Sequence, residues 1–130
     1  MINNKIISQA SKTNFYGLKK KYTHKYKMKN KNCGDIINLE VIIKNQKFKS
    51  MRYETESCIY CQASASFLAY SIKQFSISDF KRIFLLMRET AYNKSTPKKY
   101  KKFEFLFSNK NRIDCVLLPF NALLKACKIL

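Results

Sequence analysis

The amino-acid sequence predicts one domain of the α+β class, in which an antiparallel β-hairpin is followed by helices. Its 130 residues are 46% hydrophobic, which fits the size and the core of one compact domain. Strand-forming residues flank a polar turn in the first half of the chain, and apolar residues recur at helical spacing in the second half. Strands followed by a run of helices are typical of this class.

The hairpin is predicted from two segments and the turn between them. Residues 36–43 are rich in isoleucine, leucine and valine, which favour extended backbone. Residues 47–55 place apolar side chains among polar ones, as a strand with one buried face does. The polar residues 44–46 predict a tight turn, although Asn-Gln is a weaker turn signal than Asn-Gly.

Two helices are predicted next along the chain. Residues 60–73 carry small residues and then apolar side chains on one helical face, so this helix should begin just after Cys58. Ser78 is a suitable N-cap and Asp79 suits the first turn of a second helix over residues 79–92.

The last helix is predicted over residues 116–129, and Pro119 is tolerated if it lies in the first turn. Residues 93–102 are polar and basic and contain a proline, which predicts an exposed connection. The apolar residues 103–107 fit either a short helix or a short strand, and the sequence does not decide between them.

The chain carries 26 Lys and Arg against 8 Asp and Glu, a net charge of +18. Such a charge first suggests nucleic acid or an acidic partner. The chain is also rich in lysine, asparagine, isoleucine, phenylalanine and tyrosine and poor in glycine, proline and tryptophan, as an AT-rich coding sequence imposes on any protein. The charge alone therefore does not indicate a function.

Nine lysines and no acidic residue lie within residues 1–32. A run of like charges favours a surface position. We therefore expect a basic N-terminal arm over residues 1–32, partly helical or flexible, and a compact domain over residues 33–130.

The sequence contains no run of about 18 apolar residues, and its first residues are too polar for a secretory signal peptide. We therefore expect a cytoplasmic protein with no membrane partner. Cytoplasmic thiols are kept reduced, so the five cysteines favour metal binding or thiol chemistry over a disulfide framework.

Three cysteines and one aspartate are the candidates for this chemistry. In an extended backbone Cys33 and Asp35 would point the same way, so that both could reach one ion. Cys58 and Cys115 each precede a predicted helix, where the helix dipole favours the thiolate. Three thiolates and a carboxylate suit tetrahedral zinc or one edge of an iron–sulfur cluster. The spacing fits equally well with cysteines that serve as small buried hydrophobic residues.

Across about residues 14–124 the chain resembles the NifU-like scaffold family, and within it the SufU branch. The motifs that carry the resemblance are N-F-Y-G at 14–17, N-C-G-D at 32–35, C-I-Y-C-Q-A-S-A-S at 58–66 and R-I-D-C at 112–115. Fifty-seven positions separate the second and third candidate cysteines, as in the SufU branch and unlike the shorter IscU branch. The Leu-Pro-Pro-Val-Lys chaperone motif of IscU is missing.

The resemblance implies a three-stranded antiparallel sheet packed by helices, the SufE/NifU-like fold. It also implies that one site holds zinc and receives persulfide sulfur from a cysteine desulfurase, with Cys33 as the sulfur acceptor of a zinc-dependent sulfurtransferase. The alternative within the family is an iron-binding scaffold that builds an iron–sulfur cluster and passes it to apo iron–sulfur proteins, with the aspartate as the labile ligand. In either case the implied ligands are Cys33, Asp35, Cys58 and Cys115.

Several residues near these motifs depart from the family pattern or have an open role. Ser57 stands where the family has glycine, which affects the expected loop geometry at Cys58. Asp114 would be a second carboxylate able to compete as a ligand. Arg112 matches the SufU branch, and its guanidinium would pair with Asp35 when metal is absent.

Three further residues are expected to lie outside the ligand set. Cys61 is expected to be a thiol on a helix face, and Cys127 a core residue on an apolar stripe. His24, the only histidine, is expected to be a solvated residue of the basic arm.

A third hypothesis is a basic nucleic-acid-binding module with a structural zinc ion. It is motivated by the net charge and by eight tyrosines, which could stack on bases. The basic residues are spread along the chain, and no recognised nucleic-acid motif accompanies them. We therefore rank this hypothesis below the two iron–sulfur assembly functions.

Overall fold

The computed structural model describes residues 3–93 and 98–127. It contains a three-stranded antiparallel sheet in the order β1-β2-β3, formed by His24–Lys29, Ile36–Lys44 and Lys47–Glu56. Strands β2 and β3 are the predicted hairpin, with Lys44 paired to Lys47 across a two-residue turn. The α+β class and the three-stranded sheet are thereby confirmed.

The α-helices are α1 (Asn4–Ala10), α2 (Ile59–Ser71), α3 (Ile77–Asn93) and α4 (Ile113–Ala126). Helices α2, α3 and α4 agree with the predicted segments, with shifts at their ends. Short 3-10 helices cover Ile72–Gln74, Lys98–Phe107 and Lys110–Arg112. Residues 103–107, for which helix and strand were both open, are therefore helical. Of the expected connection over residues 93–102, residues 94–97 lie outside the described part of the chain.

The start of α3 differs from the prediction by two residues, because Ser76 and not Ser78 caps this helix. The Ser76 hydroxyl accepts a hydrogen bond from the Asp79 backbone N–H (3.1 Å), and the Asp79 carboxylate accepts one from the Ser76 N–H (3.5 Å). This reciprocal pair is a capping box that satisfies two N–H groups at the helix start.

Helix α4 begins three residues earlier than predicted. Asp114 lies in its first turn, where an acidic side chain interacts favourably with the helix dipole. As a result, Pro119 lies inside the helix and not in its first turn, so that expectation was wrong. A proline has no N–H to donate, which leaves the carbonyl of Cys115 without its usual helical donor.

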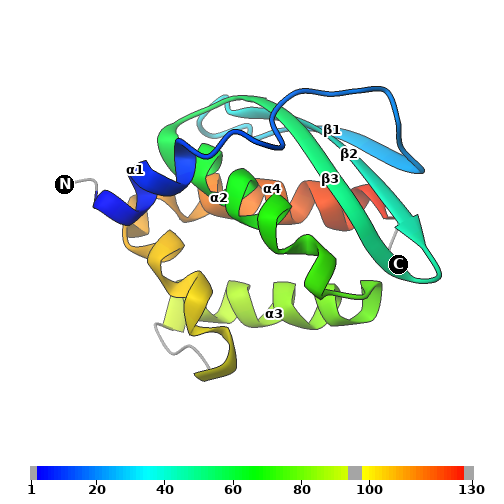
Figure 1. The fold of residues 1–130 in the computed structure, drawn as a ribbon. Coiled ribbons are helices and arrows are strands. Elements are labelled where there is room, and N and C mark those ends of the chain that lie inside the picture. Colours follow the sequence, from blue (N-terminus) through cyan, green and yellow to red (C-terminus); the bar gives the residue numbers. More distant parts are fainter. Residues whose placement is uncertain (1–2, 94–97, 128–130) are drawn as a thin grey trace.

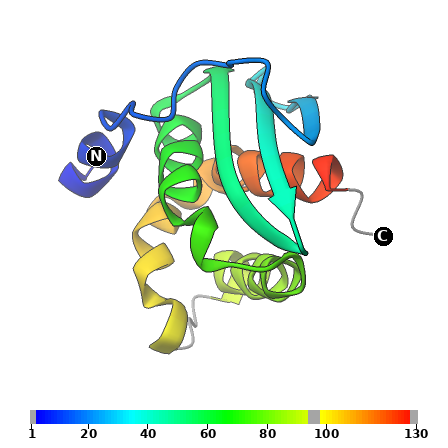
Figure 2. The same cartoon turned by 45° about the vertical axis from the view of Figure 1, so that its right-hand side comes forward.

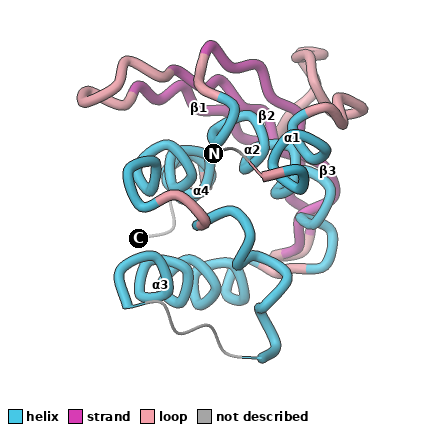
Figure 3. The backbone as a smooth tube through the Cα atoms, turned by 90° about the vertical axis from the view of Figure 1, so that its left-hand side faces the viewer, coloured by secondary structure: helices cyan, strands magenta, loops and turns pink. Residues whose placement is uncertain are grey.

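The elements form three layers, which Figures 1 and 3 show from two sides: the sheet, then α2 and α4, then α3. Helix α2 packs against β3, and α4 packs against β1 and β2. Aromatic rings join the layers, since Phe80 of α3 lies 5.8 Å from Phe48 of β3 and 6.2 Å from Phe120 of α4, measured between ring centroids. Helix α1 lies at the edge of the molecule against α2 (Figure 2).

The basic N-terminal segment contributes to this structure. Strand β1 lies within it, and the loop before β1 is hydrogen-bonded to strands β2 and β3. The backbone N–H of Gly17 donates to the Tyr53 carbonyl (2.8 Å). The buried carboxylate of Glu40 accepts from the backbone N–H groups of Lys19 and Lys20 (3.0 and 3.1 Å). The division of the chain into an arm over residues 1–32 and a domain over residues 33–130 stays a prediction.

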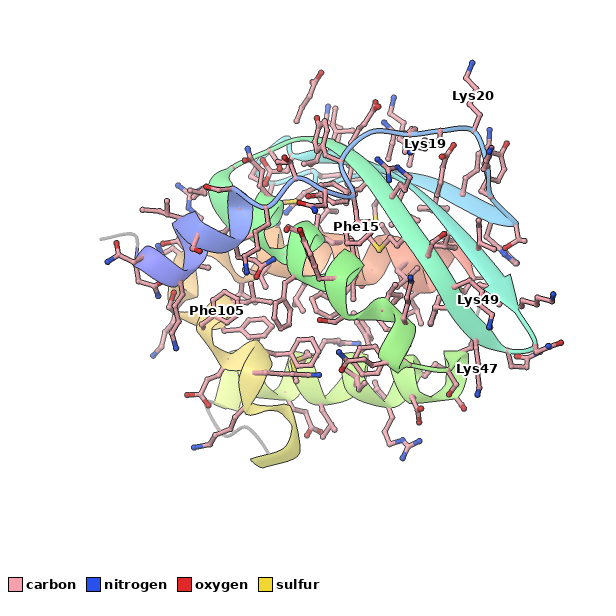
Figure 4. The ribbon with its side chains drawn as sticks, in the orientation of Figure 1. Phe15, Lys19, Lys20, Lys47, Lys49 and Phe105 are labelled. Atoms are coloured by element: carbon pink, nitrogen blue, oxygen red, sulfur yellow. The ribbon has the colours of Figure 1, made fainter. Side chains whose placement is uncertain are left out.

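The lysines are distributed over several parts of the molecule. Figure 4 shows Lys20 pointing away from the body above the sheet, and Lys47 and Lys49 extending from β3 near its hairpin end. Within the described residues, no helix has the length and apolar character needed to span a membrane.

The hairpin turn offers a first testable prediction. Asn45 and Gln46 both have left-handed backbone angles, with φ of 54° and 64°. Asparagine tolerates this conformation, but a glutamine in it is strained. We expect Gln46→Gly to raise the free energy of unfolding by about 0.5 to 1 kcal/mol, as measured by chemical denaturation. Lys44→Gly, one residue before the turn in strand β2, is the control and should lower the free energy of unfolding; equal effects would contradict this account.

Candidate metal and sulfur site

The tight connection between β1 and β2 carries Cys33 and Asp35. The Asn30 N–H donates to the Asp35 carbonyl and the Gly34 N–H donates to the Asn30 carbonyl, both at 2.8 Å. Gly34 has a φ of +77°, a conformation that side-chain-bearing residues rarely adopt. The cysteine and the aspartate therefore converge through a turn, and not through the extended backbone from which their convergence was predicted.

Cys58 lies at the N-cap of α2, as predicted. Its backbone has φ −70° and ψ 165°, and its N–H donates to Asp35 Oδ1 (3.3 Å). The residue before it, Ser57, does not have the positive φ that would require glycine. Ser57 instead accepts a hydrogen bond from the Thr55 hydroxyl (2.8 Å), and its carbonyl accepts one from Gln62 (2.9 Å). The serine in place of glycine thus leaves this loop well bonded.

Cys115 lies in the first turn of α4 and is only 3% exposed. Its Sγ is 3.7 Å from the Sγ of Cys33, which is exposed. Cys33 Sγ, Cys115 Sγ and a carboxylate oxygen of Asp35 all lie within 4.8 Å of one another. Three of the four predicted ligands, from two distant parts of the chain, are therefore close enough to bind one ion.

The fourth predicted ligand, Cys58, is half-buried and is not part of this closest group. Its side chain is nevertheless near Cys115. Burial first, and then the nearby Cys58 and Asp35 side chains, raise the pKa of the Cys115 thiol. This is the opposite of the thiolate stabilisation expected from the helix dipole. The main reason is that burial disfavours the charged thiolate, and the neighbouring thiols and carboxylate disfavour it further when no cation is present.

The Asp35 carboxylate is the clearest sign of a cation site. It is 7% exposed, and its Oδ2 has no hydrogen-bond partner among the described residues. An unpaired buried carboxylate oxygen is unfavourable. A metal ion bound between this oxygen and the nearby sulfur atoms would satisfy it, and would also favour the thiolate form of the cysteines. The residues present therefore fit a thiolate-binding metal such as zinc or iron.

Two of the flanking residues lie beside this group without joining it. Arg112 is exposed at the N-cap of α4, and in the described part of the chain it makes no ion pair with Asp35. Asp114 is also exposed, and its Oδ2 accepts a hydrogen bond from the side chain of Asn32 (3.4 Å). This bond joins the loop that carries Cys33 to the helix that carries Cys115. Sequence reasoning gave Asn32 no role, although it is the first residue of the N-C-G-D motif.

The remaining thiols and the histidine lie elsewhere. Cys61 is fully buried, with its Sγ 3.9 Å from the Thr55 hydroxyl, and burial raises its pKa to about 12. Cys127 caps the C-terminal end of α4 against the core, and burial raises its pKa to about 12. His24 lies at the end of β1 that pairs with Val41, the opposite end from the Cys33 loop.

These features define a small α+β domain with a cysteine–aspartate site at one end of its sheet. The model of the NifU-like N-terminal domain family matches residues 2–126. The chain belongs to this family, whose members are iron–sulfur cluster assembly scaffolds. Comparison with curated protein sequences finds no significant match.

Solved structures with the same fold include a nitrogen-fixing NifU-like protein, N-terminal part, from Brucella abortus. It is 19% identical with a TM-score of 0.85, and the alignment covers 97% of this chain and 91% of that one. A protein described as an iron–sulfur cluster assembly scaffold for the SUF system, from Fervidobacterium islandicum AW-1, is 20% identical with a TM-score of 0.86. That alignment covers 95% of this chain and 94% of the other. The predicted SufE/NifU-like fold is thus confirmed.

Proposed function

We propose that this chain is a sulfur acceptor of SufU type in iron–sulfur cluster assembly, with zinc bound by Cys33, Asp35, Cys58 and Cys115. The observation that carries the proposal is the difference in exposure within the site. Asp35 and Cys115 are buried, whereas Cys33 is exposed on the loop between β1 and β2. Cys58 is half-buried, so Cys33 is the sulfur atom of the site that is most accessible to a second protein.

The zinc ion, when bound, keeps its cysteine ligands in the thiolate form at neutral pH. The unpaired Oδ2 of Asp35 supplies the carboxylate ligand, and its Oδ1 is held by the Cys58 N–H. Carboxylate oxygen is a harder donor than thiolate sulfur and binds zinc alongside it. Asp35 thus completes a set of four ligands with the three cysteines.

The sulfur transfer uses a cysteine persulfide on a desulfurase as donor. The Cys33 thiolate attacks the outer sulfur of that persulfide, and a new sulfur–sulfur bond forms on Cys33. The sulfur–sulfur bond of the donor breaks, and the desulfurase cysteine leaves as a thiolate. Cys33 then carries the persulfide, which is the form in which sulfur reaches the cluster assembly pathway.

The second candidate function is a scaffold on which an iron–sulfur cluster is built and then transferred to apo iron–sulfur proteins. The same donor set supports it, because three thiolates and a carboxylate also suit the edge of a cluster. In this case Asp35 would be the ligand that is most easily exchanged. Its position beside an exposed cysteine would allow the cluster to leave from the open side of the site.

Metal analysis of anaerobically purified protein separates the two functions. The sulfur-acceptor function predicts about one zinc ion per chain and no visible absorption, because zinc has a filled d shell. Bound iron with acid-labile sulfide and a visible absorption spectrum would contradict it and favour the scaffold. The measurement requires no partner protein.

A further inference from the structure

We propose that Cys115 is a resolving thiol, which attacks a persulfide on Cys33 and releases its outer sulfur as sulfide. This inference rests on the proposed function, since that function places the persulfide on Cys33. It adds a second activity to the metal-free form of the site, in which neither sulfur atom is held as a ligand. Sulfur accepted at the surface would be reduced to sulfide within the chain, without an outside reductant for that single turnover.

The geometry supports this pairing of thiols. The two Sγ atoms lie 3.7 Å apart, and a disulfide requires about 2 Å. Cys115 is fixed by its position in the first turn of α4 and by burial. Cys33 lies on an exposed turn beside Gly34, so a small movement of this turn would bring the sulfur atoms into bonding distance.

The reaction balances with these two residues alone. The sulfur of Cys115 attacks the inner sulfur of the Cys33 persulfide, and a Cys33–Cys115 disulfide forms. The bond between the inner and outer sulfur atoms breaks, and the outer sulfur leaves with its electron pair as hydrosulfide, which takes up the proton lost by Cys115. The two cysteine thiols are oxidised, and the transferred sulfur is reduced to sulfide.

Burial decides which thiols can act. Cys115 is 3% exposed, so a thiol from outside has little access to it, whereas Cys33 beside it is open to solvent. The released sulfide therefore leaves from the exposed side. Cys61 is fully buried next to Thr55, and Cys127 is at the other end of α4, so neither competes for Cys33. Cys58 is near Cys115 but lies outside the group formed by Cys33, Asp35 and Cys115, and peptide mapping distinguishes a disulfide that involves it.

The test uses the full-length chain after metal removal by a chelator, because a metal bound by both sulfur atoms would block the step. Anaerobic protein is mixed briefly with inorganic polysulfide, desalted, and followed by sulfide assay, intact mass and peptide mapping. We expect Cys33 to gain one sulfur atom and then lose it as about one sulfide per chain, leaving a Cys33–Cys115 disulfide.

Cys115→Ala should retain the sulfur on Cys33 and release sulfide at least about tenfold more slowly. Cys127→Ala, which removes a thiol outside the site, should behave as the unchanged chain does. Peptide mapping of the unchanged chain provides a test that does not depend on the folding of a variant. Absence of sulfur uptake at Cys33, a disulfide between any other pair, or unchanged sulfide release from Cys115→Ala would overturn the proposal.

Polysulfide loads Cys33 without a desulfurase, so this test is separate from that of the proposed function. A desulfurase that does not deliver sulfur to Cys33 would contradict the proposed function. The polysulfide experiment would still give its own result on the resolving role of Cys115.

Discussion

Replacing Cys33 with alanine is expected to abolish the stimulation of a cognate cysteine desulfurase by this protein. The desulfurase can begin a new cycle only when its persulfide sulfur has been removed, and Cys33 is the exposed thiol of the site. Removing that thiol leaves the donor persulfide without its acceptor. The measurement is the initial rate of alanine formation from cysteine, with and without this protein.

Loss of metal must be distinguished from loss of the acceptor in this experiment, because Cys33 is also a proposed ligand. Cys58→Ser is the matched variant, since it removes a proposed ligand and keeps Cys33. It should retain a measurable part of the stimulation, and Cys127→Ala should retain all of it. Undiminished stimulation by Cys33→Ala would rule out the sulfur-acceptor mechanism while leaving the scaffold function open.

The same assay reports on the lysines. Exposed lysines of residues 1–32, of which Lys29 and Lys31 lie just before Cys33, could steer an acidic desulfurase surface toward the site. Steering between exposed charges weakens as salt shortens the screening length. We expect stimulation at subsaturating protein to fall as ionic strength rises; stimulation independent of salt would exclude this contribution.

A second large effect is expected on metal content. Replacing Cys33, Cys58 or Cys115 singly with serine should lower the bound zinc or iron by at least about tenfold, because each change removes a thiolate from a four-ligand site. Metal per chain is measured after equilibration with a competing chelator. Full occupancy in any one of the three variants would remove that residue from the ligand set, and the test is sharpest for Cys58, which lies outside the closest group.

Cys127→Ser is the matched control for these variants. Cys127 is a half-buried cysteine at the end of α4, packed against the core. A hydroxyl in this apolar position should lower the free energy of unfolding by about 1 to 2 kcal/mol and leave metal content unchanged. A folded Cys127→Ser protein that lost its metal would contradict the ligand assignment.

The parts of the fold that the sequence predicted are those with an unambiguous local signal. Helices α2 and α3 were predicted from apolar residues at helical spacing, and the β2–β3 hairpin from strand-forming residues on both sides of a polar turn. The start of α4 was misplaced because the apolar run begins at Val116, whereas the helix already includes the acidic first turn at Asp114. The local pattern also gave no means of seeing that Pro119 would lie inside the helix.

Strand β1 was not predicted from the local sequence pattern, because its lysines favoured a surface arm. Its lysines alternate with other residues, a period of two that is typical of a strand, but the lysine-rich composition favoured an arm. In the structure Lys25, Lys27 and Lys29 are exposed, while His24 and Met28 are half-buried. Lysines on an edge strand also hinder pairing with another chain. Only the resemblance implied a third strand.

The sequence predicted which residues of the candidate site come together more accurately than it predicted how the backbone brings them together. Cys33, Asp35 and Cys115 come together as expected, but through the turn at Gly34 and a buried first helical turn. The sequence could not show that Asp35 Oδ2 is unpaired or that Cys115 is buried, because both depend on contacts between segments far apart in the chain. The raised pKa of Cys115 follows from those contacts.

The most direct test of the central claim is to locate the sulfur that a desulfurase delivers. The full-length protein is mixed with a cognate cysteine desulfurase and cysteine under anaerobic conditions, quenched with an alkylating agent at early times, and analysed by peptide mass spectrometry. The account predicts that the first additional sulfur atom is found on Cys33. Sulfur found first on Cys58, Cys61, Cys115 or Cys127, or no sulfur on any cysteine, would contradict it.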